Sequence, residues 1–247
     1  MIDIGIAMAD AHKPIHHEQA YETVMMFCDE IKPKHIMNLG DIGHFGGISH
    51  WNSLRYAMRQ KYPVKKDIEG VRDHFTHQRK ANPKSEIYFF EGNHEHWIYD
   101  YIENHPELKD WIDIDRDLGI SSNNIIRVPR EKQPMKLGKL RFIHGWFTNK
   151  YHAFKTGSQI HHNIVYAHAH DMQSFTSDNI ETGQRFMSWS IGHLSDESKA
   201  DYLKNRPTNW MLGFAIFYIN RETGDFTFVP IALPKGYFYW NGKRYKA

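Results

Sequence analysis

Short apolar runs in the first part of the chain each end at an acidic or amide side chain. The runs cover residues 2–9, 35–39 and 86–91, and they are followed by Asp10, Asp41 and Asn93. Between the runs lie segments with apolar residues at helical spacing, at 16–31, 49–61 and 67–81. This strand–helix–strand alternation predicts parallel βαβ units.

The second half of the chain has a different pattern, because strand-like runs replace most helical segments. After a polar, helical stretch at 96–118, the runs lie at 125–128, 140–144, 163–167, 186–191, 214–219 and 226–230. Residues 220–225 are typical of a hairpin turn between the last two. The whole pattern predicts an α/β fold in which two mixed β-sheets pack face to face as a β-sandwich, flanked by helices. We expect a single domain over residues 1–247, since no repeat or long linker interrupts it.

The composition fits a packed globular protein. Of the 247 residues, 40% are hydrophobic and 14% aromatic, unlike a disordered chain. Lys and Arg total 31 against 29 Asp and Glu, a balance that neither requires nor excludes a nucleic-acid partner. Cys28 is the only cysteine, which excludes an internal disulfide and a metal site made of cysteines alone. Its place on an apolar helical stripe indicates a buried structural thiol.

The N-terminal sequence MIDIGIAMAD lacks a basic leader and contains acids, so it is not typical of a secretory signal. No apolar run approaches the roughly 18 residues that a membrane span needs. We therefore expect a cytoplasmic protein with no membrane partner, and the oligomeric state stays open. The 18 histidines are unusual and favour a metal site, since histidine is the commonest metal ligand.

Candidate ligand side chains follow the predicted strands. They are Asp10, His12, Asp41, Asn93, His94, His144, His168 and His170. Sites in open α/β sheets form beyond the carboxyl ends of the strands, so these residues can converge although they are far apart in sequence. Carboxylate, amide oxygen and imidazole suit borderline divalent metals such as Mn, Fe, Zn or Ni, and without a thiolate a structural zinc site is not expected. One carboxylate can bridge two ions about 3.5–4 Å apart, which can hold a hydroxide and clamp a phosphate.

The candidate ligands fall into five short motifs whose order resembles that of the calcineurin-like metallophosphoesterases. The family pattern is D-x-H, G-D, G-N-H-[DE], a lone His often before Gly, and G-H-x-H. Here the motifs are Asp10-Ala11-His12, Gly40-Asp41, Gly92-Asn93-His94-Glu95, His144-Gly145 and Ala167-His168-Ala169-His170. The one departure is Ala167 in place of Gly, which changes no ligand.

The resemblance implies a role for each residue. The first metal would be bound by Asp10, His12, Asp41 and His170, and the second by Asp41, Asn93, His144 and His168. Asp41 would bridge the two ions. His94 would not bind metal but would contact phosphate and protonate the leaving oxygen, with a purely structural hydrogen bond as the alternative. We expect two divalent cations, Mn first, with Fe, Zn, Ni or Mg as alternatives.

Residues after Asp41 bear on the substrate. The Ser/Thr protein phosphatases of the family continue with an acid and an Arg that grips phosphate, and both are missing here. His44, three residues after Asp41, resembles the histidine of the Mre11/SbcD-type nucleases that contacts nucleic-acid phosphate; a loop histidine at the rim is the alternative. Trp146, Phe147 and Trp97 could stack on a base, or pack in the core or rim.

Other polar clusters have simpler interpretations. The acids of 113–117 do not fit a calcium loop, because Gly119 is one place late and Asn124 stands where Glu is needed. The pairs His16-His17 and His161-His162 are expected on solvated helix faces. Lys132, Lys136, Lys139 and Arg141 favour a charged edge strand of a hairpin over a phosphate track.

The sequence therefore predicts a dinuclear-metal hydrolase of phosphate esters, acting as a phosphodiesterase or nuclease on nucleic acid or nucleotides. A metal-bridging hydroxide would attack phosphorus directly, with His94, Asp41 and His44 as the catalytic residues. One alternative is a phosphomonoesterase acting on nucleotides or proteins. Another is a non-catalytic scaffold, but degenerate ligands would mark a scaffold, and each ligand position of the family pattern is filled here.

Overall fold

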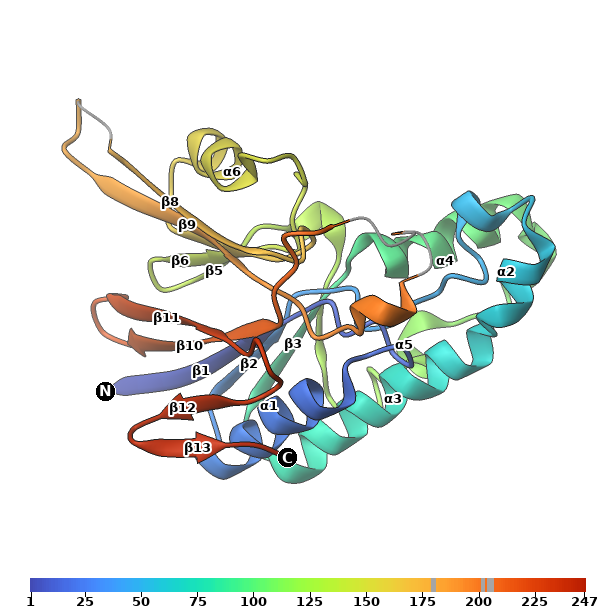
Figure 1. Ribbon diagram of the computed structural model, residues 1–247, viewed down its shortest axis with the longest axis horizontal. Helices are drawn as coiled ribbons and strands as arrows, with labels where there is room; N and C mark the ends of the chain where they lie inside the picture. The colour runs from blue at the N-terminus through green and yellow to red at the C-terminus, as the bar shows by residue number, and fades with distance from the viewer. Residues whose placement is uncertain (179–180, 201–202, 204–206) are drawn as a thin grey trace.

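Two β-sheets packed face to face form the centre of the molecule, with helices on their outer faces and around one end (Figure 1). This computed structural model describes residues 1–178, 181–200, 203 and 207–247. The predicted fold class, two packed mixed sheets flanked by helices, is confirmed.

The first sheet has six strands in the order β11-β10-β1-β2-β3-β4. Their bounds are β1 Ile2–Met8, β2 His35–Asn38, β3 Glu86–Phe90, β4 Ile126–Val128, β10 Gly213–Asn220 and β11 Phe226–Ala232. The strands β1 to β4 run parallel, and β10 and β11 add to the β1 edge as an antiparallel hairpin. The predicted βαβ units and the predicted turn at 220–225 are thus both present.

The second sheet has the order β5-β6-β7-β9-β8. Its strands are β5 Met135–Leu137, β6 Leu140–Phe142, β7 Ile164–Tyr166, β8 Met172–Asp178 and β9 Arg185–Ile191. The three central strands β6, β7 and β9 run parallel, and β5 and β8 pair antiparallel at the edges. As predicted, the charged segment around Lys136 is an edge strand of a hairpin, and Lys139 there pairs with Asp225.

The helices cover the sheets on both sides. Their bounds are α1 Glu18–Ile31, α2 Tyr56–Lys61, α3 Val64–Ala81, α4 Asn93–Asn104, α5 Ile114–Asp117 and α6 His152–Ile160, with 3-10 turns η1 His50–Asn52, η2 Pro106–Leu108, η3 Arg130–Lys132 and η4 Glu197–Lys199. Helices α1 and α3 pack on the outer face of the first sheet, and α6 packs on β8 and β9 (Figure 1). The short ribbon β12 Phe238–Trp240 and β13 Lys243–Tyr245 packs its aromatic rings on Phe27 of α1.

Two large apolar layers hold this arrangement together. One lies between the sheets and contains Leu39, Phe90, Phe142 and Phe217, all fully buried. The other lies between the first sheet and its helices, and it contains Cys28, which is fully buried as predicted. Buried apolar area of this kind is the main stabilising term in a fold. None of the helices in the described ranges is long and apolar enough to cross a membrane.

Several element predictions need correction. The predicted helix at 49–61 is divided into η1 and α2, and the stretch at 96–118 is divided into α4, η2 and α5. Neither histidine pair lies within a helix: His17 is the N-cap of α1 and accepts a hydrogen bond from Ala20 N, while His161 is the left-handed C-cap of α6. Histidine can cap because its ring nitrogen satisfies a free backbone N–H.

Candidate metal centre

The polar residues that follow the strands of both sheets meet at one end of the sandwich. Asp10 and His12 follow β1, Asp41 follows β2, Asn93 opens α4 after β3, His144 follows β6, and His168 and His170 follow β7. Parallel strands end at a common edge, so each loop brings its side chain to the same place. The structure places every sequence-predicted ligand in this cluster.

One group of ligand atoms consists of Asp10, His12 and His170, whose donor atoms lie within 4.8 Å of one another. Nε2 of His12 and Nε2 of His170 are 3.2 Å apart. Oδ1 of Asp10 lies 3.2 Å from Nε2 of His170 and 3.9 Å from Nε2 of His12. Three donor atoms therefore converge from the ends of two strands that belong to different sheets.

A second group consists of Asp41, His144 and His168, again within 4.8 Å of one another. Oδ2 of Asp41 lies 3.4 Å from Nε2 of His144. That same nitrogen is 3.0 Å from Oδ1 of Asn93, so the amide oxygen joins the group. The second group contains a carboxylate, an amide oxygen and two imidazoles.

The backbone at these ligands has an unusual conformation. Asp10, His12, Asp41, His168 and His170 all have positive φ, between 49° and 70°. This left-handed region is sparsely populated by residues other than glycine, and each such residue costs of order 1–3 kcal/mol. Strain of this kind persists where the surrounding structure fixes it, and it clusters at functional sites.

The buried carboxylate of Glu95 holds the strained loops in place. It accepts hydrogen bonds from the backbone N–H groups of Asp41, Ile42, Gly43 and Gly92 at 2.9–3.1 Å. Gly92 itself must be a glycine, since a Cβ there would lie 2.1 Å from Oδ1 of Asp41. Glu95 thereby ties the loop after β2 to the start of α4.

Further hydrogen bonds orient the ligand side chains. Backbone N–H groups donate to the carboxylates, from His94 to Asp41 at 2.9 Å and from His168 to Asp10 at 3.0 Å. Nδ1 of His144 donates to the carbonyl oxygen of Leu39 at 2.7 Å, which leaves Nε2 facing Asp41 and Asn93. Such contacts fix the tautomer and ring orientation of a metal-binding histidine.

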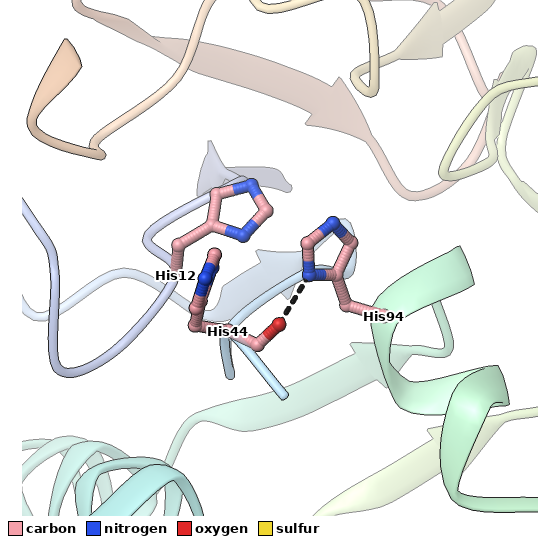
Figure 2. A group of neighbouring side chains, drawn as sticks. All are labelled: His12, His44 and His94. Atoms are coloured by element: carbon pink, nitrogen blue, oxygen red, sulfur yellow. Dashed lines mark hydrogen bonds between the residues drawn. The ribbon is translucent and has the colours of Figure 1, made fainter. Parts of the chain in front are cut away.

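A third group consists of His12, His44 and His94 (Figure 2). Nδ1 of His94 donates to the carbonyl oxygen of His44 at 2.5 Å, the dashed line in the figure. Nε2 of His94 then lies 3.8 Å from Oδ2 of Asp41. His44 is almost fully buried, and its ring contacts His12, His94 and Tyr62. The His44 side chain therefore belongs to the cluster, and its main-chain oxygen also positions His94.

Burial and neighbouring charges determine the protonation of the cluster. Burial, together with the positive charges that His94 and His170 can carry, holds the pKa of His12 well below its usual range. Burial also lowers the pKa of His168 to about 4. Burial alone would raise the pKa of Asp41, but His144 and His94 outweigh it, so that pKa lies well below its usual range. His12 and His168 are thus neutral imidazoles and Asp41 is an ionised carboxylate, which are the forms that bind metal.

These residues fit a pair of divalent cations. Oδ1 of Asp10 is fully buried without a hydrogen-bond partner among the described residues, although a buried, unpaired carboxylate oxygen is costly. Nε2 of His12 and Nε2 of His170 both face it. For His144, burial lowers the pKa but Asp41 more than compensates, raising it to about 9, so a proton sits where a cation could bind. Carboxylate and imidazole donors suit a borderline divalent metal.

A cavity of about 490 Å³ opens onto the cluster. Its lining includes Asp41, His44, Asn93, His94, His168 and His170 together with Trp51, Arg55, Tyr62, Trp97 and Trp210. Of the three aromatic residues that we expected near the site, Trp97 lines the cavity and packs against His94, with ring centroids 3.9 Å apart and planes tilted by 36°. Trp146 and Phe147 are not among its described lining residues; Lys155 lies over the Phe147 ring.

Sequence reasoning missed the residues that support the site. It assigned no role to Glu95, although this acid belongs to the G-N-H-[DE] motif. It could not identify the carbonyl oxygens of Leu39 and His44, because main-chain atoms carry no residue signature. It also missed His193, whose ring stacks on that of His170 at 5.1 Å with an angle of 10°.

No model of a protein family matches the chain. The chain is 20% identical to the Gene 54 protein of Mycobacterium phage D29 over 248 residues, and the match covers 92% of each. It is 19% identical to the Gene 54 protein of Mycobacterium phage L5 over 245 residues, again covering 92% of each. Neither protein name states an activity.

Among solved structures, Vacuolar Protein Sorting 29 from Cryptosporidium parvum aligns with a TM-score of 0.49 and 12% identity, covering 100% of this chain and 96% of that one. Vps29 from Entamoeba histolytica aligns with a TM-score of 0.40 and 10% identity, covering 99% and 98%. The function is therefore inferred from the site itself.

Proposed function

We propose that this protein is a calcineurin-like metallophosphoesterase that hydrolyses phosphodiesters of nucleic acid or nucleotides with two divalent cations. The observation that carries the proposal is the pair of ligand groups, one around Asp10 and one around Asp41, at the end of a single cavity. Left-handed backbone at five of the ligand positions supports it, because such strain marks a functional site.

The two groups would hold one cation each. Asp10, His12 and His170 would bind the first, and Asn93, His144 and His168 the second. Asp41 would serve both, since its Oδ2 lies 3.4 Å from Nε2 of His144 and its carbonyl oxygen accepts a hydrogen bond from the backbone N–H of His12 at 3.0 Å, which holds it beside the first group. When bound, the cations would activate a water molecule and neutralise charge on the phosphate.

His94 would handle the proton of the leaving group. Its Nδ1–H is engaged by the His44 carbonyl oxygen, so Nε2 is the nitrogen that can face a substrate in the cavity. Burial lowers the pKa of His94, and the carboxylate of Asp41, 3.8 Å from Nε2, opposes this shift in favour of the protonated ring that a general acid requires. Because its free nitrogen lies beside Asp41, His94 would act where the scissile bond is held.

His44 favours a diester over a monoester. A monoester carries two negative charges and is best gripped by a guanidinium group. Arg55 is the only Lys or Arg among the described residues that line the cavity, and it belongs to the outer wall rather than to the ligand groups. His44 is a smaller donor beside His94, better matched to the single charge of a diester.

A panel assay with Mn tests the proposal. Single-stranded DNA, duplex DNA, RNA and bis-p-nitrophenyl phosphate represent diesters, and p-nitrophenyl phosphate represents monoesters. We expect Mn-dependent cleavage of the diesters to exceed that of the monoester, and cleavage of nucleic acid to fall steeply with salt. A clear preference for p-nitrophenyl phosphate, with every nucleic acid left intact, would instead establish the phosphomonoesterase alternative.

A further inference from the structure

The segment between the loop after β2 and helix α3 has a charge unlike the rest of the chain. Residues 42–66 contain no Asp or Glu, and their basic residues are Arg55, Arg59, Lys61, Lys65 and Lys66. The whole chain is nearly balanced, with 31 basic and 29 acidic residues. The local excess of positive charge therefore lies at the start of α2, on α2 and at the start of α3, next to the proposed active site.

Four aromatic side chains lead from the ligand cluster to this basic segment. Measured between ring centroids, His94 lies 3.9 Å from Trp97, Trp97 lies 6.3 Å from His50, and His50 lies 4.4 Å from Trp51. We call these residues the aromatic row. The row ends at the surface, where the Trp51 side chain is 74% exposed.

The aromatic row and the ligand cluster open onto one cavity. Trp51, Arg55 and Trp97 line it together with Asp41 and His94. The row begins at His94, the residue proposed to protonate the leaving group. The part of a substrate that departs would therefore extend along the row toward Trp51.

Aromatic rings beside basic side chains suit an unpaired polynucleotide strand. The neighbouring acids lie beside other cations, Asp100 in a pocket with Arg59 and Glu69 in a pair with Lys65, whereas Arg55 lines the cavity with the rings. Base–aromatic stacking stabilises single strands, and basic side chains follow the phosphate backbone. In a duplex, both faces of each base are already stacked on neighbours, so the row would have no free face to contact. An apolar protein segment would also cover Trp51, but it would gain nothing from Arg55, which lines the same cavity.

We propose that the aromatic row and Arg55 form a binding track for single-stranded nucleic acid, with bases stacked on Trp51 and Trp97 and a phosphate beside Arg55. This inference rests on the proposed function for its orientation relative to the cleaved bond. It also identifies the substrate class as a strand with unpaired bases on the leaving-group side of that bond.

Fluorescence anisotropy with a labelled dT12 oligonucleotide tests the track. Binding is measured at 4 °C on the protein as purified, and a denaturing gel checks that the probe stays intact. We expect dT12 to bind more tightly than a dT12·dA12 duplex. Trp51→Ala should weaken dT12 binding by about 5- to 140-fold, the range for loss of one stacking platform. Trp51→Phe should retain most of the affinity.

Trp111→Ala is the matched control, because Trp111 is 77% exposed and is not among the described residues that line the cavity. This variant should bind dT12 like the unmodified protein. An abasic dodecamer should bind the unmodified protein more weakly than dT12 binds Trp51→Ala, because it loses the stacking on Trp97 as well as on Trp51. Arg55→Ala should lower the slope of log Kd against log salt by about one, whereas Lys84→Ala should not.

The binding assay needs no hydrolysis, so it separates this inference from the proposed function. Tight dT12 binding that depends on Trp51, together with no cleavage by the protein in the presence of any metal tested, would support the binding track and overturn the proposed function. Cleavage of nucleic acid with equal dT12 affinity in Trp51→Ala and Trp111→Ala would overturn the track. Duplex binding as tight as single-strand binding would overturn it as well.

Discussion

The strands β1, β2 and β3 carry a cluster of histidine and carboxylate side chains at each of their two ends. Asp10, Asp41 and Asn93 follow the carboxyl ends, and Asp3, His35 and Glu86 lie at the amino ends. The residue types are nearly the same, but their charge partners and backbone conformations differ. The comparison shows which features distinguish a candidate metal centre from an ion-pair network.

At the amino ends, each charge has a partner. Arg221 makes a bidentate pair with Asp3, and Lys34 lies 2.9 Å from Glu86. His35 lies between the acids, 3.3 Å from Asp3 and 3.1 Å from Glu86. The three strand residues stand within extended backbone, paired in the sheet. This cluster needs no bound metal ion, because arginine and lysine already supply the positive charge.

At the carboxyl ends, the opposite holds. Nδ1–H groups there are engaged by backbone carbonyls at His94 and His144, while their Nε2 atoms face carboxylates. Asp10 keeps one oxygen without a hydrogen bond among the described residues. Left-handed backbone turns the ligands inward. Convergent donors with no lysine or arginine among them, held by strained loops, are what a bound metal would satisfy.

Replacing Asp41 should have the largest effect of any single change. Asp41→Ala removes a ligand from both groups, so we expect the rate to fall by more than about 10⁴-fold and metal to be lost from both sites. Phosphodiesterase assays and metal analysis of the purified protein measure the two effects. Glu86→Gln, at the amino ends, should keep both rate and metal. An Asp41→Ala protein with two tightly bound metals and a near-normal rate would show that Asp41 does not serve both groups.

His94→Ala should have the next largest effect. It removes no proposed ligand, so metal content should stay unchanged while the rate falls roughly 10²–10⁴-fold, the usual range for a general acid. The loss should shrink for p-nitrophenolate esters, whose leaving group needs little protonation. His96→Ala is the control, because His96 lies on the same helix but pairs with Asp100 at the surface. Equal losses on good and poor leaving groups would mean that His94 only positions the phosphate.

The fold could be predicted from the sequence where patterns are local. Buried strands such as β1 and the hairpin of β10 and β11 follow from apolar runs and a turn sequence. The strand β8 was missed because its residues alternate between exposed and half-buried, without an apolar face that would mark it. The prediction of one continuous helix at 49–61 was wrong, because nothing in the sequence at 53–55 indicates the interruption between η1 and α2.

The candidate site could be predicted as a set of residues but not as a geometry. The motifs identified side chains that the structure brings together, such as Asp10 and His170. They did not indicate the left-handed backbone, since Asp and His carry no local signal for positive φ comparable to glycine. The hydrogen bonds of Glu95 and the aromatic row depend on contacts between distant segments, so they appear only in the folded protein.

Asp67 illustrates the free-energy cost of burying a carboxyl group that has no compensating cation. It lies in the first turn of α3 and is almost fully buried, and a backbone hydrogen bond from Phe45 offsets only part of the effect of burial. Burial raises its pKa to about 8. The folded protein therefore holds a proton that the unfolded chain releases near pH 4, so stability falls as pH rises between about 4 and 8, by at most about 1.4 kcal/mol per unit.

Asp67→Asn imitates the protonated acid, so it should remove this part of the pH dependence. Urea unfolding from pH 4.5 to 8 should show little difference between variant and unmodified protein at the acid end. The variant should be increasingly more stable toward pH 8. If the difference in unfolding free energy stayed constant with pH, Asp67 would be ionised in the folded protein. Another group would then compensate the cost of burying its charge.

The smallest effect is expected at the amino ends, where Asp3→Asn removes the partner of Arg221. The hydrogen bonds from Arg221, against a smaller opposing effect of burial, hold the pKa of Asp3 below its usual range. A lowered carboxyl pKa stabilises the fold above the unfolded pKa near 4, and this stabilisation is lost as pH falls through the folded pKa. Because Arg221 is half-exposed and keeps its hydration, we expect Asp3→Asn to lower the melting temperature by only about 2–4 °C at pH 7. The difference should vanish below about pH 3 and shrink in 1 M salt, as for an exposed ion pair.

Metal content and hydrolysis should not change. A loss of metal from Asp3→Asn would show that the two ends of the strands are coupled and that the amino-end cluster is more than an ion-pair network.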